Sequence, residues 1–322
     1  MSAPIDVPST MGALLLGGFF ASMLSGIVIL QALWYFTTYK SDSLNFKALV
    51  LGVCTLDTLH TAFIWASMWG YLIGDYGESS KIDYIPWSIA LTVVLTALVT
   101  FFVHCFFAHR ILLLSKHNLL MAGPVVILAL LRLVSACVST WEMFHYQSFV
   151  LFRLHARWIF TLGLSVSSAV DILITTLFLY LFQSSRPEAG HLNHILNQLM
   201  LYTFETGSLT CIGTVVSMIC WVSMDNLIFL GLHFVIGKLY ANSLLVTLNT
   251  RETIRRSTSG SRENGPVLFL EPRSPQTQKT SASGQYFTGA VSKGATEVQI
   301  NVERTVQYMH DLDNDTLSID AK

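Results

Sequence analysis

The chain has 322 residues, of which 52% are hydrophobic and 12% are charged, with a mean hydropathy of +0.54. Soluble domains carry about 25% charged residues, so this composition excludes an ordinary soluble protein and predicts a polytopic, all-α membrane protein. The formal net charge of −1 says nothing about nucleic acid, and we expect no nucleic-acid partner.

Seven apolar segments are each long enough to cross the lipid bilayer as a helix, which takes about 20 residues. We therefore predict a seven-helix transmembrane bundle over residues 11–248, preceded by a short extracellular N-terminus of residues 1–10. Only four residues separate the sixth segment from the seventh, which predicts a tight turn. The predicted transmembrane helices cover about residues 11–36, 47–73, 87–110, 119–138, 158–183, 199–222 and 227–248.

The basic residues near the ends of these segments predict the orientation of the bundle. Cytoplasmic loops of membrane proteins carry an excess of Lys and Arg. With the N-terminus outside, nine basic residues fall on the cytoplasmic side and three on the outer side, so we predict a cytoplasmic C-terminus. The cytoplasmic set is Lys40, Lys47, Arg110, Lys116, Arg186, Arg251, Arg255, Arg256 and Arg262, and the outer set is Lys81, Arg153 and Arg157.

Residues 249–322 have a different composition, rich in Ser, Thr, Gly and Pro, which cannot bury a core and predicts a disordered cytoplasmic tail. Its basic start, Arg251 to Arg262, is expected to contact anionic lipid of the cytoplasmic leaflet. Two arginines precede Ser257, Thr258 and Ser259, which are therefore predicted phosphorylation sites. The alternative is an unmodified basic collar at the membrane surface.

Lys238 lies well inside the last apolar segment, where an unpaired cation costs on the order of 3 kcal/mol or more. Acidic residues of other segments lie at comparable depth, and we expect Lys238 to bridge one of them: Asp57, Asp171 or Glu205. Asn242 lies one turn away from Lys238 on the same face of the helix. These residues predict a polar core in the cytoplasmic half of the bundle.

Two interpretations of this polar core remain open. The network either fixes the packing of the helices only, or it forms a ligand, ion or switch site. The predicted members are Asp57, His60, His104, Arg132, Asp171, Glu205, Lys238 and Asn242.

The sequence predicts no metal, no cofactor and no catalytic residue. His104 and His233 are expected to differ in depth by about 15 Å, which is too far for one zinc ion to bridge them. A retinal Schiff base on Lys238 would need an acid one turn earlier, and that position holds Phe234. No nucleophile elbow, His-Glu-x-x-His motif or phosphate loop is found, so we expect no enzyme activity.

Several motifs carry a resemblance to a known family. They are GKLYANSLLVTLNTR (237–251), FFAHRI (106–111), SSAVDILIT (167–175), FETGSLT (204–210) and CTLDTLHT (54–61). Over residues 12–255 the chain resembles an uncharacterised seven-transmembrane family of basidiomycete, mushroom-forming fungi, classified as a domain of unknown function. The chain departs from that family at His104, where Gln is frequent. The resemblance implies the architecture and assigns no activity.

Two functions fit these features. A receptor-like or sensory protein suits seven helices, an external N-terminus and a basic, Ser/Thr-rich tail that could engage a cytoplasmic signalling partner. The alternative is a transporter or channel that uses the intramembrane Asp, Glu, Lys and His cluster. Since the sequence carries no retrieval or transit signal, we expect the plasma membrane as its location.

Overall fold

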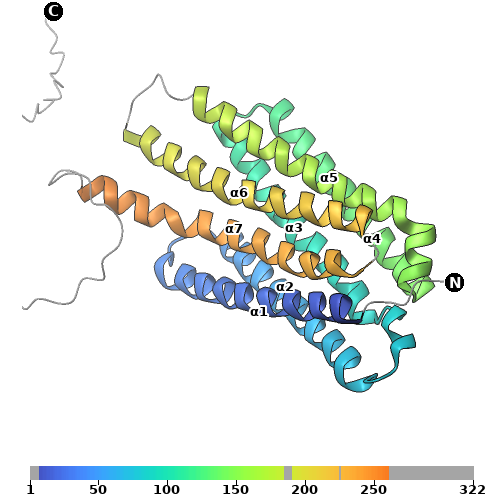
Figure 1. The fold of residues 1–322 in the computed structure, drawn as a ribbon. Coiled ribbons are helices and arrows are strands. Elements are labelled where there is room, and N and C mark those ends of the chain that lie inside the picture. The colour runs from blue at the N-terminus through green and yellow to red at the C-terminus, as the bar shows by residue number, and fades with distance from the viewer. Residues whose placement is uncertain (1–6, 185–190, 225, 261–322) are drawn as a thin grey trace, which may run out of the picture. The chain divides into compact units, whose positions relative to one another are not determined.

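The computed structural model describes residues 7–184, 191–224 and 226–260, and this part of the chain is helical throughout apart from short connections. Figure 1 shows the helices side by side in a bundle, with successive helices running in alternating directions. The α-helices are α1 (Val7–Thr38), α2 (Leu44–Trp69), α3 (Trp87–Leu114), α4 (Leu119–Tyr146), α5 (Phe149–Ser184), α6 (His191–Ser223) and α7 (Ile228–Gly260). A π-helix (η1, Gly70–Gly74) and a 3-10 helix (η2, Ser79–Asp83) follow α2.

Six of these helices are long and apolar enough to cross a membrane. The apolar segments lie in α1, α2 with η1, α3, α4, α5 and α7. The apolar part of α6 with described side chains, Gly207–Ser223, is shorter. The predicted all-α class and the predicted membrane location of the chain are therefore confirmed, and the chain is a multi-pass integral membrane protein.

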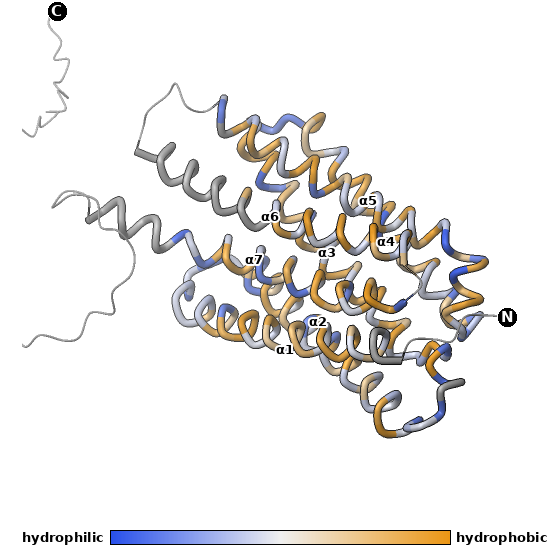
Figure 2. The backbone as a smooth tube through the Cα atoms, viewed as in Figure 1, coloured by the Kyte–Doolittle hydropathy of each residue, from blue (hydrophilic) through white to orange (hydrophobic). Residues whose placement is uncertain are grey.

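The distribution of side chains is inverted relative to a soluble protein. Large apolar side chains face outward on most helices, for example Phe19 (63% exposed), Ile127 (67%) and Trp158 (67%). Charged groups such as Asp57 (2%) and Lys238 (0%) are buried among the helices. In Figure 2, hydrophobic colour follows most of the length of α1 to α5. An apolar exterior with a polar interior is stable in lipid, because hydrocarbon does not penalise exposed apolar atoms.

Helix α7 lies in the interior of the bundle, as does α3. It packs against α1, α2, α3 and α6, whereas α4 packs against α3 and α5. Within its apolar segment, 72% of α7 is buried, compared with 33% of α1 or α4. Any polar group on α7 therefore has neighbours from several helices, and this explains why most of the buried polar contacts described below involve this helix.

Two glycines allow α1 and α7 to approach each other closely. A Cβ added at Gly17 would lie 2.5 Å from the Cα of Gly231, and one added at Gly231 would lie 2.4 Å from the carbonyl oxygen of Ala13. Only a residue without a side chain fits at such a backbone contact. Small residues have this role at many helix interfaces in membranes.

The helices extend beyond the predicted apolar segments at several ends. Helix α4 continues to Tyr146 and α5 begins at Phe149, so the predicted outer loop between them is mostly helical. Gln147 makes the turn in the left-handed region, with φ of 52°. Arg153, predicted in that loop, lies on α5 and donates hydrogen bonds to the carbonyl oxygens of Trp221 and Met224, which satisfies the end of α6.

The predicted boundary of the tail at residue 249 also differs from the structure. Helix α7 continues to Gly260, so the segment that contains Ser257, Thr258 and Ser259 is helical. Thr250 and Arg251 are still bonded to the preceding turn through the carbonyl oxygens of Val246 and Leu248. The apolar composition of α7 ends near Arg251, but the helix continues to Gly260, and composition alone misses this extension.

Candidate functional site

Lys238 on α7 has a complete set of partners in the interior of the bundle. Its Nζ lies 3.0 Å from Oδ1 of Asp57 on α2, and it donates to the backbone oxygen of Asp57 at 2.7 Å and to Oγ1 of Thr61 at 2.6 Å. Ser25 on α1 donates to the other carboxylate oxygen of Asp57 at 2.5 Å. The three ammonium protons thus have three acceptors, and the two charges neutralise each other. We call Lys238, Asp57, Thr61 and Ser25 the lysine network.

Asn242 and His60 lie beside the lysine network without joining the ion pair. The side-chain amide of Asn242 donates to the carbonyl oxygen of Lys238 at 2.9 Å and to that of Leu24 at 3.3 Å, which links α7 to α1. Nε2 of His60 lies 3.0 Å from Oγ1 of Thr96 on α3. His60 therefore bonds to α3 and makes no hydrogen bond to Asp57.

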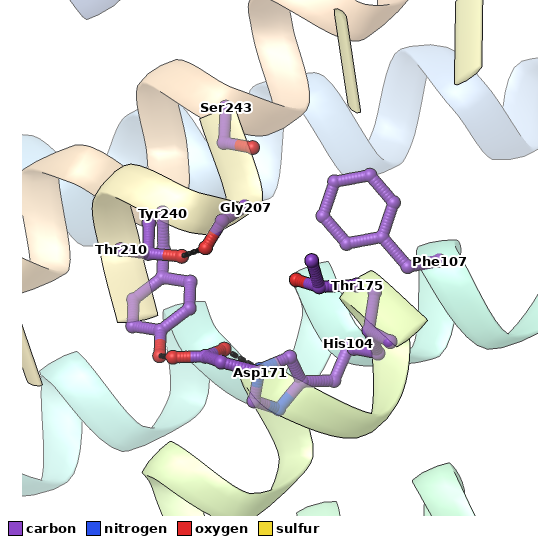
Figure 3. Close-up of a pocket in the computed structure, with 9 residues that line it drawn as sticks. His104, Phe107, Asp171, Thr175, Gly207, Thr210, Tyr240 and Ser243 are labelled. Carbon is purple, nitrogen blue, oxygen red and sulfur yellow. Dashed lines mark hydrogen bonds and ion pairs between the residues drawn. The ribbon is translucent and has the colours of Figure 1, made fainter. Parts of the chain in front are cut away.

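Asp171 on α5 is the centre of a second buried network. Tyr240 donates to its Oδ2 at 2.5 Å, and Nε2 of His104 lies 3.2 Å from its Oδ1. Thr214 on α6 donates to Oδ2 at 3.4 Å, and Ser167 lies 3.2 Å from the hydroxyl of Tyr240. Figure 3 shows Tyr240 and His104 reaching Asp171 from opposite sides, beside a cavity of about 10 Å³. We call these five residues the aspartate network.

The prediction of one polar core is therefore corrected to two networks, separated by α7. Lys238 and Tyr240 are two residues apart, which places them about 200° apart around a helix. Lys238 consequently faces α1 and α2, while Tyr240 faces α3, α5 and α6. Of the three acids proposed as partners of Lys238, the structure pairs it with Asp57, and Asp171 has Tyr240 and His104 instead.

Arg132 on α4 belongs to neither network. It is 7% exposed, and within the described part of the chain it makes no hydrogen bond or ion pair. It lines a cavity of about 30 Å³ together with His233 of α7, Ser135 and Ser139. The side chain of Glu205 and those of Ser257, Thr258 and Ser259 lie outside the described residues.

Sequence reasoning missed a further contact at the end of α7. Arg251 pairs with Oδ2 of Asp42 at 2.6 Å, and Tyr35 donates to the same oxygen at 2.9 Å. The guanidinium of Arg251 also lies 4.7 Å from the ring centre of Tyr39, whose hydroxyl donates to the backbone oxygen of Asn249. This α7 latch joins the end of α7 to the connection between α1 and α2. The sequence offered one signal for this contact: Asp42 is an acidic residue in a short predicted cytoplasmic loop, and Arg251 begins the basic segment at the cytoplasmic end of the last helix.

In both networks the buried carboxylate has hydrogen-bond or ion-pair partners within the protein. Among the described residues, no group of three His, Cys, Asp or Glu side chains is arranged to hold a metal ion. The cavities beside Asp171 and Arg132 have volumes of about 10 and 30 Å³, which is room for one or two water molecules and not for an organic cofactor.

Comparison with known proteins gives a family match for one part of the chain. Residues 167–253 match a family of unknown function, DUF6534. The matched segment spans the second half of α5, all of α6 and most of α7, and it includes Asp171, Tyr240 and Lys238. No curated protein and no solved structure gives a significant match. The match agrees with an uncharacterised domain and assigns no activity.

Proposed function

We propose that the chain is a receptor-like membrane protein with seven spans, an external N-terminus and a cytoplasmic C-terminus, in which α7 carries the signal. The observation that carries the proposal is the position of α7. It contributes Lys238 to one buried network, Tyr240 to another, and Arg251 to the α7 latch. A rotation or shift of this helix would change all three contacts together, as a bistable switch requires.

The length of α6 supports the seventh span. Its 33 residues correspond to a helix of about 50 Å, and the hydrocarbon core of a bilayer is about 30 Å thick. The α7 latch also brings the α1–α2 connection to the same end of the bundle as the end of α7. Under the proposed topology both are cytoplasmic, beside Lys40 and Lys47, in agreement with the positive-inside rule.

The closed interior favours signalling over transport. Both networks are internally hydrogen-bonded, and the cavities beside Asp171 and Arg132, of about 10 and 30 Å³, are too small for an organic solute. A transporter or channel is the second candidate, and the unpaired, buried Arg132 is the observation that favours it. Intramembrane cations without protein partners frequently belong to ion pathways.

A pull-down in mild detergent from native membranes tests the receptor proposal, with the full-length chain compared with a chain truncated after Arg262. We expect the full-length chain to retain a heterotrimeric G protein or a kinase, and the truncated chain to lose it. An Asp42→Asn variant, which weakens the α7 latch, should change the amount of bound partner. Absence of any signalling partner from all three samples, together with ion or proton flux in liposomes, would favour the transporter instead.

The proposal also covers the membrane in which the protein lies and the lipids that it contacts. We place it in the plasma membrane, where the basic end of α7 would contact anionic lipid. Phosphorylation at Ser257, Thr258 or Ser259 would add negative charge there and weaken that contact. Imaging of a tagged chain tests the location, and binding to vesicles with and without phosphatidylserine tests the lipid contact.

A further inference from the structure

The cavity beside Arg132 contains the one buried guanidinium of the described helices that has neither a hydrogen bond nor an ion pair. An arginine side chain keeps its charge, because guanidinium is not deprotonated in proteins. A buried charge without a partner costs several kcal/mol even after relaxation. Among the described residues, no side chain in contact with Arg132 supplies a negative charge, and Nε of its guanidinium has no acceptor.

The neighbouring carboxylate of Asp171 makes no hydrogen bond or ion-pair contact with Arg132. Asp171 lies near enough to attract Arg132 through space, but its two oxygens receive their hydrogen bonds from Tyr240, Thr214 and His104. No carboxylate oxygen among the described residues lies within ion-pairing distance of Arg132. Nε of Arg132 has no hydrogen-bond partner.

His233 adds a second unpaired polar atom to the same cavity. It lies on α7, is 4% exposed, and its Nε2 has no hydrogen-bond partner. Ser139 on α4 also lines the cavity and is 1% exposed, which places a third buried polar side chain at the wall. A guanidinium, an imidazole and a hydroxyl are all hydrogen-bond donors, and donors gathered around one cavity suit an anion.

The size of the cavity limits the anion that fits. Its volume is about 30 Å³, and a single water molecule needs about 10–15 Å³ by the same measure. Phe160, Leu164 and Val93 form the apolar part of the wall. Such a space accepts a monatomic ion and excludes a carboxylic acid, a phosphate ester or a lipid headgroup.

We propose that Arg132, His233 and Ser139 form a buried binding site for a monatomic inorganic anion such as chloride. Helix α4 packs mainly against α3 and α5. An anion held between Arg132 of α4 and His233 of α7 links these two helices and compensates the guanidinium. The site goes beyond the proposed signalling function and does not depend on it.

Thermal unfolding of the purified full-length protein in detergent tests this site. Sodium chloride or bromide is compared with sodium gluconate at constant ionic strength. We expect a saturable rise in Tm with either halide, of about 3 °C or more, and none with sulfate. Arg132→Gln should abolish the rise. Arg157→Gln should retain it, because Arg157 is exposed and bonds to the carbonyl oxygen of Val222.

Line broadening of the chloride-35 NMR signal measures binding directly and does not require the variant to be stable. The purified wild-type protein should broaden the signal, and bromide should reverse the broadening while sulfate does not. If Arg132→Gln cannot be purified, His233→Leu should weaken chloride binding by about tenfold, as expected for the loss of one donor to a charged group. Equal Tm values in halide and gluconate and no bromide-sensitive broadening would mean that the cavity holds water only and would overturn the proposal.

Discussion

Lys238 shows how a single cation is accommodated inside the bundle. Removing one member of a buried ion pair leaves the other charge without compensation, which costs about 3–5 kcal/mol. We therefore expect Lys238→Met to lower the stability of the purified protein strongly. The double variant Lys238→Met with Asp57→Leu should regain most of that loss, because neither charge remains. A Lys238→Met protein with wild-type Tm and normal trafficking would contradict the lysine network.

Tyr240 tests the aspartate network in the same way. Its hydroxyl donates to the carboxylate of Asp171, and a hydrogen bond to a charged group contributes about 1.5–3 kcal/mol. Tyr240→Phe should lower the free energy of unfolding by about this amount, measured by denaturation in detergent. Tyr180→Phe is the matched control, since Tyr180 is 56% exposed and should be silent. Equal stability of the two variants would exclude a structural role for the Tyr240 hydroxyl.

The sequence identified the charged members of both networks and missed the hydroxyl groups that complete them. A charge inside an apolar segment stands out, so Asp57, Asp171 and Lys238 were found. Ser25 and Thr61 were not, because hydroxyl residues are common in membrane helices and usually bond to their own backbone. Which acid pairs with Lys238 depends on the rotation of three helices, and a single sequence does not contain that information.

At the level of single elements, the contact between α1 and α7 depends on Gly17 and Gly231. A Cβ at Gly17 would overlap the backbone of α7, which cannot move without displacing Lys238 and Tyr240. Gly17→Ala should therefore destabilise the protein by about 1–3 kcal/mol, the usual range for overpacking. Gly26→Ala, on the same helix with open space around it, should be neutral or slightly stabilising. Thermal unfolding of the two variants separates the effects, and equal Tm values would contradict the close contact.

The α7 latch makes a separate prediction about the end of that helix. Asp42 and Arg251 are 21% and 30% exposed, so their ion pair is worth only about 0.5–1 kcal/mol. Asp42→Asn should leave Tm nearly unchanged and increase amide hydrogen exchange at Asn249 and Thr250. Glu78→Gln, an exposed acid in the η1–η2 connection, is the control. Unchanged exchange in Asp42→Asn would show that Arg251 does not hold this end of α7.

Helix existence was easier to predict than helix length. Apolar runs of about 20 residues predict the membrane segments, and a helix of the structure, with η1 counted as part of α2, covers each of the seven predicted segments to within a residue. Among the described residues, however, only six helices are long and apolar enough to cross a membrane. The ends could not be predicted in the same way, because hydrogen bonds continue the helices after the apolar composition stops. The extension of α7 to Gly260 and the start of α5 at Phe149 are the main examples.

At the scale of the whole molecule, the exterior is apolar, as a lipid environment requires, and the interior contains paired charged groups. Apolar side chains cover the outer faces of the helices, and buried polar groups concentrate around α7. Hydropathy predicts the first feature, because it depends only on composition along each helix. The division of the polar interior into two networks and an anion site depends on the order of the helices around α7, which composition does not specify.

The receptor-like account depends on seven spans that place the two termini on opposite sides of the membrane. Antibody access to epitope tags at each end of the chain, on intact and on permeabilised cells, tests this most directly. The account predicts that the N-terminal tag is reached on intact cells and that the C-terminal tag is reached only after permeabilisation. Both tags on the same side would leave six spans, with α6 outside the bilayer, and would contradict the proposed topology and the signalling function that rests on it.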